Sequence, residues 1–250
     1  MADRNLLADP RSPELVLALE TATTALSVAL LRGEELVDEV LAPAGPAAQM
    51  LLPAVDRLLG SAGVALGELE AFAISIGPGS FTSLRVGIST LKGLAFESGL
   101  PVAPVSTLAA LARAAGPTDQ LVVPMLDARR GEFYAAAYAG ASQEAVVPEG
   151  VYTPEALCAR IRPPCVLVGE GAELGGEAIA AALGEGVAIL GPPEGNPRAR
   201  YVGALGVEQL ARGSWVSAAQ LVPHYLRRAE AEVKRLGERF EPAPETPEPV

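Results

Sequence analysis

The chain has 250 residues, of which 50% are hydrophobic and 20% are charged, and its formal net charge is −11. A chain of this size and composition can bury a sizeable core, which excludes a disordered or fibrous protein and allows one large domain or two modest ones. The negative charge argues against a broad basic surface that binds nucleic acid or an anionic membrane directly. If the protein acts on RNA, we therefore expect a partner to hold the RNA.

The sequence offers few side chains for metal or thiol chemistry. His224 is the only histidine, and Cys158 and Cys165 are the only cysteines. A single histidine excludes the H-E-x-x-H metalloproteases, and two cysteines at this spacing fit neither a disulfide scaffold nor a zinc knuckle, so we expect no metal. The chain also lacks an unbroken apolar run of about 18 residues and an apolar N-terminal signal segment. We therefore expect a cytoplasmic protein with no membrane partner.

The first half of the chain alternates short apolar runs, which are typical of buried strands, with amphipathic patterns, which are typical of helices. This alternation is the pattern of an α/β protein. It predicts strands over residues 15–19, 26–31, 35–40, 72–76 and 102–105, and helices over residues 47–62, 81–97 and 107–115.

The second half of the chain repeats this alternation of apolar runs and amphipathic patterns. It predicts strands over residues 121–126, 133–138, 145–148 and 166–168, and helices over residues 154–161 and after residue 171. Glu20 and Asp127 each end the first strand of their half and are followed by a short loop and a returning strand. This repetition predicts a duplicated architecture, with a chance similarity of two hairpins as the alternative.

The repetition divides the chain into an N-terminal subdomain over residues 14–105 and a second subdomain over residues 106–235. The C-terminal segment of the second subdomain is expected to pack back on the body as a strand or helix. Residues 1–13 are polar and contain two prolines, and residues 236–250 alternate proline and glutamate. We expect both to be tails, the second of them disordered, because neither can bury enough apolar surface to fold.

The most informative segment covers residues 76–87 and reads Ile-Gly-Pro-Gly-Ser-Phe-Thr-Ser-Leu-Arg-Val-Gly. Here a buried strand runs into a glycine turn, and the turn opens a helix whose first N–H groups lack partners within the helix. Gly77 and Gly79 allow a ligand or another backbone to approach closely, and Ser80 or Thr82 can cap the helix. The arrangement predicts either an anion or phosphate site or a plain tight turn; it matches neither a Walker loop nor a dinucleotide fingerprint.

The helix after this turn carries an apolar stripe and two internal glycines. Leu84, Ile88 and Leu91 lie above one another at helical spacing. Gly87 and Gly93 each cost about 1 kcal/mol relative to alanine in a helix interior. Such a helix needs a close neighbour on its glycine face, which is either the core of the same chain or a second subunit.

Glu20 and Asp127 end their strands where actin-like ATPases hold the carboxylates that orient magnesium, water and phosphate. Such enzymes follow the acid with a glycine-rich loop, whereas here Thr-Ala-Thr-Thr-Ala follows Glu20 and Ala-Arg-Arg-Gly follows Asp127. The alanine side chains crowd the backbone, and Arg129 adds positive charge. We therefore interpret the sequence as a nucleotide-binding frame whose catalytic loops have degenerated.

Four segments in this order together resemble the TsaB (YeaZ) family. They are residues 17–23 (Leu-Ala-Leu-Glu-Thr-Ala-Thr), residues 76–87, residues 126–134 (Leu-Asp-Ala-Arg-Arg-Gly-Glu-Phe-Tyr) and residues 223–227 (Pro-His-Tyr-Leu-Arg). The G-P-G-S-F-T-x-L-R motif is highly specific, whereas the other three are weak alone. The resemblance covers residues 14–235. The chain departs from the family pattern at four places, namely Glu20, Ala47, Ser83 and Glu170.

The resemblance implies an α/β, actin-like (ASKHA, ribonuclease H-like) fold with two related subdomains and degenerate nucleotide loops. It implies a non-catalytic activating or scaffold subunit that binds the larger TsaD paralogue, which transfers a threonylcarbamoyl group to the adenosine beside the tRNA anticodon. Further implied partners are a TsaE-like ATPase, tRNA only indirectly, and a second copy of the chain in a homodimer. No cofactor of its own is implied; ATP or ADP at the partner interface is an open alternative.

The resemblance also assigns residues to sites. The helix of the glycine motif contributes to the partner or dimer face, which we predict to include Ser80, Phe81, Thr82, Leu84, Arg85, Ile88 and Leu91. On that basis we expect the substitution Leu84→Asp to abolish complex formation, because it would bury an unpaired charge. Nucleotide or anion contacts are expected at Glu20, Thr21, Gly77, Gly79, Asp127 and Arg129. The competing hypothesis is an autonomous actin-like ATPase or small-molecule kinase that uses these same residues.

Overall fold

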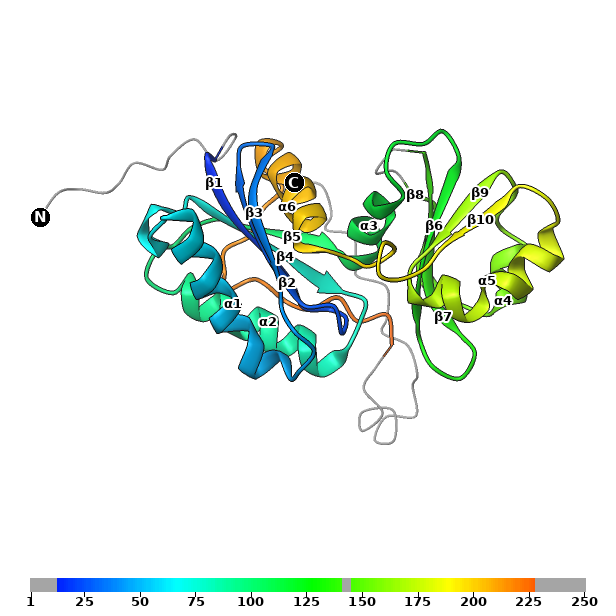
Figure 1. The fold of residues 1–250 in the computed structure, drawn as a ribbon, viewed down its shortest axis with the longest axis horizontal. Helices are drawn as coiled ribbons and strands as arrows, with labels where there is room; N and C mark the ends of the chain where they lie inside the picture. The colour runs from blue at the N-terminus through cyan, green and yellow to red at the C-terminus, as the bar shows by residue number, and fades with distance from the viewer. Residues whose placement is uncertain (1–12, 141–144, 228–250) are drawn as a thin grey trace, which may run out of the picture.

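The computed structural model describes residues 13–140 and 145–227, which form two five-stranded sheets flanked by helices (Figure 1). The predicted C-terminal tail, residues 236–250, lies outside the described residues, as does the predicted N-terminal tail except for Pro13. The two sheets lie end to end along the long axis of the molecule, with α3 (Thr107–Ala112) between them.

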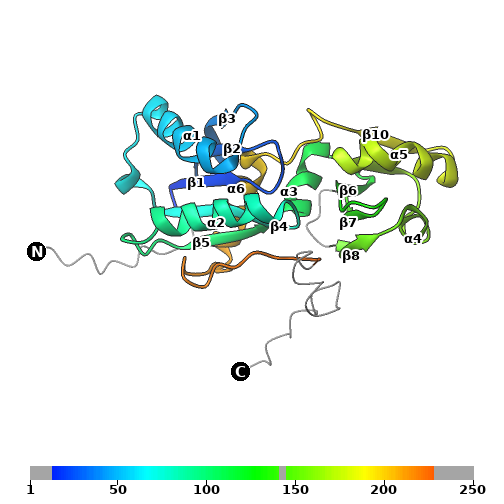
Figure 2. The same ribbon diagram turned by 90° about the horizontal axis from the view of Figure 1, so that it is seen from below.

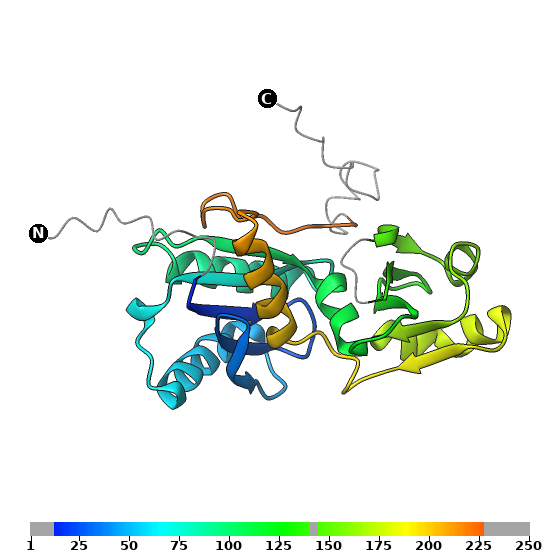
Figure 3. The same cartoon turned by 90° about the horizontal axis from the view of Figure 1, so that it is seen from above.

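The first sheet has the strand order β3-β2-β1-β4-β5. Its first three strands form an antiparallel meander, and β4 and β5 continue the sheet in parallel to β1. Both faces are covered, so alternate residues of each strand point to different helices. One face packs on α1 and α2, and the other on α6 (Figure 2 and Figure 3). The strand bounds are Leu15–Glu20, Ser27–Arg32, Glu35–Leu41, Ala71–Gly77 and Val102–Ser106, and the helices span Ala47–Ala62, Phe81–Leu94 and Ala199–Ala211.

The second sheet has the strand order β10-β9-β6-β7-β8. Its faces are covered by α3 on one side and by α4 and α5 on the other. The strand bounds are Leu121–Asp127, Phe133–Ala139, Ala145–Tyr152, Cys165–Val168 and Val187–Leu190, and α4 and α5 span Pro154–Cys158 and Glu170–Leu183. Short 3-10 turns occupy Leu66–Glu68 and Arg113–Ala115.

The two sheets share one topology. Strands β6 to β10 take the places of β1 to β5, with the same antiparallel meander followed by two parallel strands. Glu20 and Asp127 end the equivalent strands β1 and β6. The predicted duplication and the α/β actin-like fold with two subdomains are therefore confirmed.

Within residues 13–140 and 145–227, the sequence does not predict strand β10, helix α6 or the 3-10 turn at Leu66–Glu68. Helix α6 falls within the range expected for the second subdomain, yet it packs on the first sheet. Gly203 and Gly206 let it approach closely, because a Cβ atom at either position would overlap Leu31 or Ala73 of that sheet. Three helices are shorter than expected, since α2 ends at Leu94, α3 at Ala112 and α4 at Cys158.

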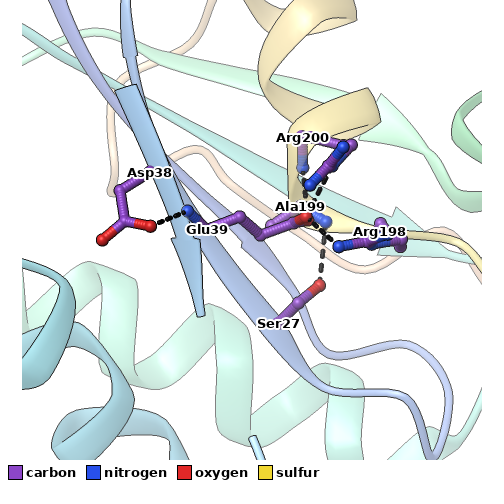
Figure 4. A network of polar contacts seen from close by, with 6 residues as sticks. All are labelled: Ser27, Asp38, Glu39, Arg198, Ala199 and Arg200. Carbon is purple, nitrogen blue, oxygen red and sulfur yellow. Dashed lines mark hydrogen bonds and ion pairs between the residues drawn. The ribbon is translucent and has the colours of Figure 1, made fainter. Parts of the chain in front are cut away.

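A polar network joins the start of α6 to the first sheet (Figure 4). The cap residue of α6 makes no side-chain hydrogen bond to the helix. Instead, Ser27 Oγ accepts the N–H of Ala199 at 2.8 Å, and Glu39 Oε1 accepts the N–H of Arg200 at 3.0 Å. Glu39 Oε2 also pairs with the guanidinium groups of Arg198 and Arg200, each at 2.5 Å. The network thus supplies both hydrogen-bond acceptors and negative charge to a helix N-terminus.

Substitution Glu39→Ala should destabilise the chain by about 3 kcal/mol, because it leaves two arginines and a helix N-terminus without their acceptor. The Glu39 side chain is only 1% exposed, so water cannot replace it. Urea unfolding followed by circular dichroism measures the change. Glu35→Ala on the same strand removes the same charge at an exposed position and should have little effect; equal losses would contradict the assigned role of Glu39.

Candidate functional site

The loop after β1 packs directly against the start of α2. Thr21 is fully buried, and its hydroxyl lies so close to Gly87 that a Cβ atom there would overlap it. Thr21 N–H points to the Ser75 hydroxyl on β4 at 3.4 Å. The close neighbour of Gly87 is therefore the chain's own core and not a second subunit.

The glycine turn before α2 is filled by the chain's own backbone. A Cβ atom at Gly79 would overlap the carbonyl oxygen of Ala22, and one at Gly77 would overlap that of His224. The Ser80 N–H donates to the Ala22 carbonyl at 2.7 Å, and the Ser80 hydroxyl caps α2. The close approach that glycine permits is thus used for internal packing, and the turn presents a protein carbonyl where a phosphate cradle would need open amides.

Glu20 is buried at the end of β1 beside this turn. Its Oε1 accepts the N–H of Ala22 at 2.6 Å, and its Oε2 has no hydrogen-bond partner among the described residues. Burial raises the pKa of the Glu20 carboxyl to about 7, although the Ser75 hydroxyl and neighbouring amides oppose the increase. Glu20 and Thr21, both predicted from the sequence as nucleotide or anion contacts, are fully buried.

In the loop after β6, Asp127 and Arg129 pair with each other. Asp127 Oδ1 accepts the N–H of Arg129 at 2.7 Å, and Asp127 Oδ2 pairs with its guanidinium at 3.1 Å. Arg129 and Arg130 adopt left-handed backbone angles, with φ of 67° and 60°. Glu170 occupies the first turn of α5, where its Oε1 lies 3.4 Å from the Asp127 amide. Acidic groups thus occupy a helix N-terminus that would otherwise attract an anion.

Residues 214–227, here called the C-terminal strap, run from α6 past β5 to the second subdomain (Figure 2 and Figure 3). Within the first subdomain, the His224 N–H donates to the Ile76 carbonyl at 2.7 Å. At the far end, the largely buried Arg227 guanidinium bonds the Ala128 carbonyl and the Glu132 carboxylate. The C-terminal strap therefore ties the two subdomains together without forming the strand or helix that the sequence predicts over its described residues.

Glu149 on β8 is the centre of a second junction between the subdomains. It accepts hydrogen bonds from the hydroxyls of Ser106 and Tyr138, and His224 Nε2 lies 3.8 Å from its Oε2. Ser106 donates to a carboxylate and also caps α3, so it is not arranged as a nucleophile activated by histidine. No motif in the sequence pointed to Ser106, Tyr138 or Glu149, because their spacing along the chain carries no recognisable pattern.

The helix residues predicted for a partner face divide into two groups. Leu84, Ile88 and Leu91 are at most 5% exposed and face the chain's own core, whereas contact with a partner needs exposed side chains. The apolar stripe is explained by the first sheet, and Leu84→Asp would damage the fold itself. The remaining predicted residues lie at the surface: Ser80, Thr82 and Arg85 are exposed and Phe81 is half-buried.

Within residues 13–140 and 145–227, no three His, Cys, Asp or Glu side chains gather in a way that could hold a metal ion. None of the described helices is both long and apolar enough to cross a membrane.

The two glycines of α2 should respond oppositely to alanine. Gly87→Ala should lower the free energy of unfolding by about 1–3 kcal/mol, because the new methyl group overlaps Thr21 in a packed core. Gly93→Ala should raise it by up to about 1 kcal/mol, because no atom lies within 4 Å and alanine favours the helix. Urea titration of both variants measures the difference, and stabilisation by both would show that the Thr21 contact is loose.

Glu20 should make the stability of the chain depend on pH. Its pKa is raised from 4.5 to about 7 in the folded chain, so the folded state binds an extra proton between these values. The resulting stabilisation is complete below pH 4.5 and is lost as the pH rises through 7. Relative to Glu20→Gln, which does not ionise, the wild type should lose about 3 kcal/mol across this window.

Urea unfolding at a series of pH values measures this difference. Glu34→Gln makes the same chemical change at an exposed position and should leave the pH profile of the wild type unchanged. Parallel profiles for the wild type and Glu20→Gln would contradict a protonated Glu20 in the folded chain.

Known proteins are similar to this chain in sequence and in fold. The family model described as "TsaD: tRNA N6-adenosine threonylcarbamoyltransferase" matches residues 47–234. The "tRNA threonylcarbamoyladenosine biosynthesis protein TsaB" of Bacillus subtilis (strain 168) is 32% identical over 226 residues, covering 88% of this chain and 96% of that protein. The protein of the same name from Escherichia coli (strain K12) is 33% identical over 226 residues, covering 85% of this chain and 94% of its own length.

Among solved structures, "YeaZ from Pseudomonas aeruginosa" superposes with a TM-score of 0.72 at 34% identity, covering 85% of this chain and 100% of that chain. Its agreement extends over both subdomains, as the full coverage of that structure requires. The chain therefore belongs to the TsaB (YeaZ) family of tRNA threonylcarbamoyladenosine biosynthesis proteins.

Proposed function

We propose that the chain is a non-catalytic subunit that docks on a TsaD-type transferase. In this role it supports transfer of a threonylcarbamoyl group to the adenosine beside the tRNA anticodon. Family membership supports the pathway. The match to the TsaD family model supports a partnership between two related folds. The net charge of −11 fits a subunit that leaves the tRNA to its partner.

The non-catalytic role is carried by one observation, the self-filled loops at the ends of β1 and β6. Protein carbonyls occupy the glycine turn, Glu20 is buried, and Asp127 is paired with Arg129. An ATPase needs these carboxylates and amides open to magnesium and phosphate. We therefore also propose that the loops of this chain bind no nucleotide by themselves. In this proposal, ATP or ADP binds at the interface between this chain and the TsaD-type transferase.

The exposed side of α2 is the face that we propose meets the partner. It consists of Ser80, Thr82, Arg85, Ser89 and Gly93 and is here called the docking face. No atom lies within 4 Å of a Cβ built at Gly93, so a partner helix could approach the backbone closely there. Helix α1 packs beside α2 (Figure 2). Two exposed apolar side chains flank the docking face. Leu52 on α1 is 52% exposed, and Phe96, just after α2, is 85% exposed.

Reconstituted tRNA modification tests this proposal. Incorporation of labelled threonine into tRNA by the TsaD-type and TsaE-type proteins of the same organism should require this chain and fall at least about tenfold without it. The isolated chain should hydrolyse no ATP. Full modification without the chain would refute the proposal, and ATP turnover that Asp127→Asn abolishes would favour the autonomous ATPase instead.

Substitution Gly93→Arg should block docking without harming the fold, because the glycine is exposed and faces open space. A large charged side chain in the middle of an interface should weaken binding of the TsaD-type protein at least about tenfold. Size exclusion with light scattering shows whether the mixed complex, a homodimer or neither forms. Ala181→Arg, at an exposed position of α5, is the matched control and should bind as the wild type does.

A further inference from the structure

Three side chains form a cluster where the C-terminal strap passes the start of α2. The rings of Phe81 and Tyr225 stack with their centroids 4.8 Å apart and an angle of 27° between their planes. The guanidinium carbon of Arg85 lies 4.0 Å from the centroid of the Phe81 ring. Arg85 Nε donates a hydrogen bond of 3.1 Å to the Tyr225 hydroxyl. Arg85 is thus held from two sides while it stays exposed on the docking face.

Arg85 keeps most of its capacity to bind an anion. A guanidinium group carries five N–H donors in a planar fork that fits a carboxylate with two parallel hydrogen bonds. Tyr225 takes only the Nε donor, and no carboxylate among the described residues pairs with Arg85. In a chain with a net charge of −11, an exposed arginine without an acidic partner is complementary to an acid on another molecule.

The C-terminal strap backbone that leads up to Tyr225 is anchored at three points before the cluster. The neighbouring His224 N–H donates to the Ile76 carbonyl at 2.7 Å, and Leu221 is buried in the first core. Earlier in the C-terminal strap, Lys92 Nζ on α2 contacts the Ala219 carbonyl at 3.4 Å. An arginine fixed in this way loses less rotamer freedom when it binds than an unsupported one would.

We propose that Arg85 recognises a carboxylate of the docking partner, and that Tyr225 is a positioning residue that orients its guanidinium group together with Phe81. The proposal rests on the proposed function, since it takes the docking face as the surface that meets a TsaD-type protein. A carboxylate fits better than a polyphosphate, because a polyphosphate would need free backbone amides beside Arg85. The Ser80 N–H already donates to the Ala22 carbonyl, and that carbonyl also packs against Gly79.

Isothermal titration of the full chain with the TsaD-type protein of the same organism tests this. Arg85→Lys keeps the charge but loses the fork, and binding should weaken about tenfold. Tyr225→Phe keeps the stacked ring but removes the hydroxyl, and binding should weaken about threefold. The double variant should bind no more weakly than Arg85→Lys alone, because Tyr225 acts through Arg85. Arg160→Lys is the matched control: its guanidinium lies 5.4 Å from the Tyr152 ring, in the second subdomain, and binding should not change.

Each alternative has its own outcome. If the two effects add in the double variant, or if Tyr225→Phe lowers the thermal unfolding temperature of the free chain in proportion, Tyr225 is structural and the positioning role is refuted. If Arg85→Lys binds within about twofold of the wild type, the recognition role is refuted. An Arg85→Lys effect seen only with ADP present would assign Arg85 to a phosphate and refute the carboxylate. Absence of binding by the wild type would refute the docking function itself.

Discussion

Contact between the loop after β1 and the glycine turn before α2 determines what the first subdomain can bind. Gly79 and Gly87 bring the two backbones together, and the Ser80 amide bonds the Ala22 carbonyl across the contact. The same contact sets the position of α2, whose inner side then joins the core and whose outer side carries Arg85. Protein carbonyls therefore fill the glycine turn, and the contact fixes the start of α2 in place.

Four acidic side chains take structural roles within the chain. Glu20 is buried beside the turn, Glu39 holds the start of α6, Glu149 joins the subdomains, and Glu170 lies at the start of α5. Carboxylates that hold backbone amides, hydroxyls or arginines are not free to orient magnesium or water. This use of carboxylates supports the proposed non-catalytic role.

Most of the sheet architecture could be predicted from the sequence, because β1, β2 and β4 are continuous apolar runs between turn residues. Helix α6 could not, because its N-terminus is held by Ser27 and Glu39, which lie about 160–170 residues earlier in the chain. The stripe of Leu84, Ile88 and Leu91 was recognisable as apolar, yet periodicity does not tell a chain's own sheet from a partner. Likewise, the glycine turn predicted a close approach but not which atoms would fill it.

Helix α6 and the C-terminal strap also set the order in which the chain can assemble during translation. The residues of the second sheet, 121–190, are contiguous, so this subdomain can fold as soon as it has left the ribosome. The first subdomain cannot, since Val16, Ala18 and Leu31 stay uncovered until residues 199–211 emerge. The half that is synthesised first is therefore the half completed last, and its uncovered apolar face is the surface that a ribosome-associated chaperone would have to shield.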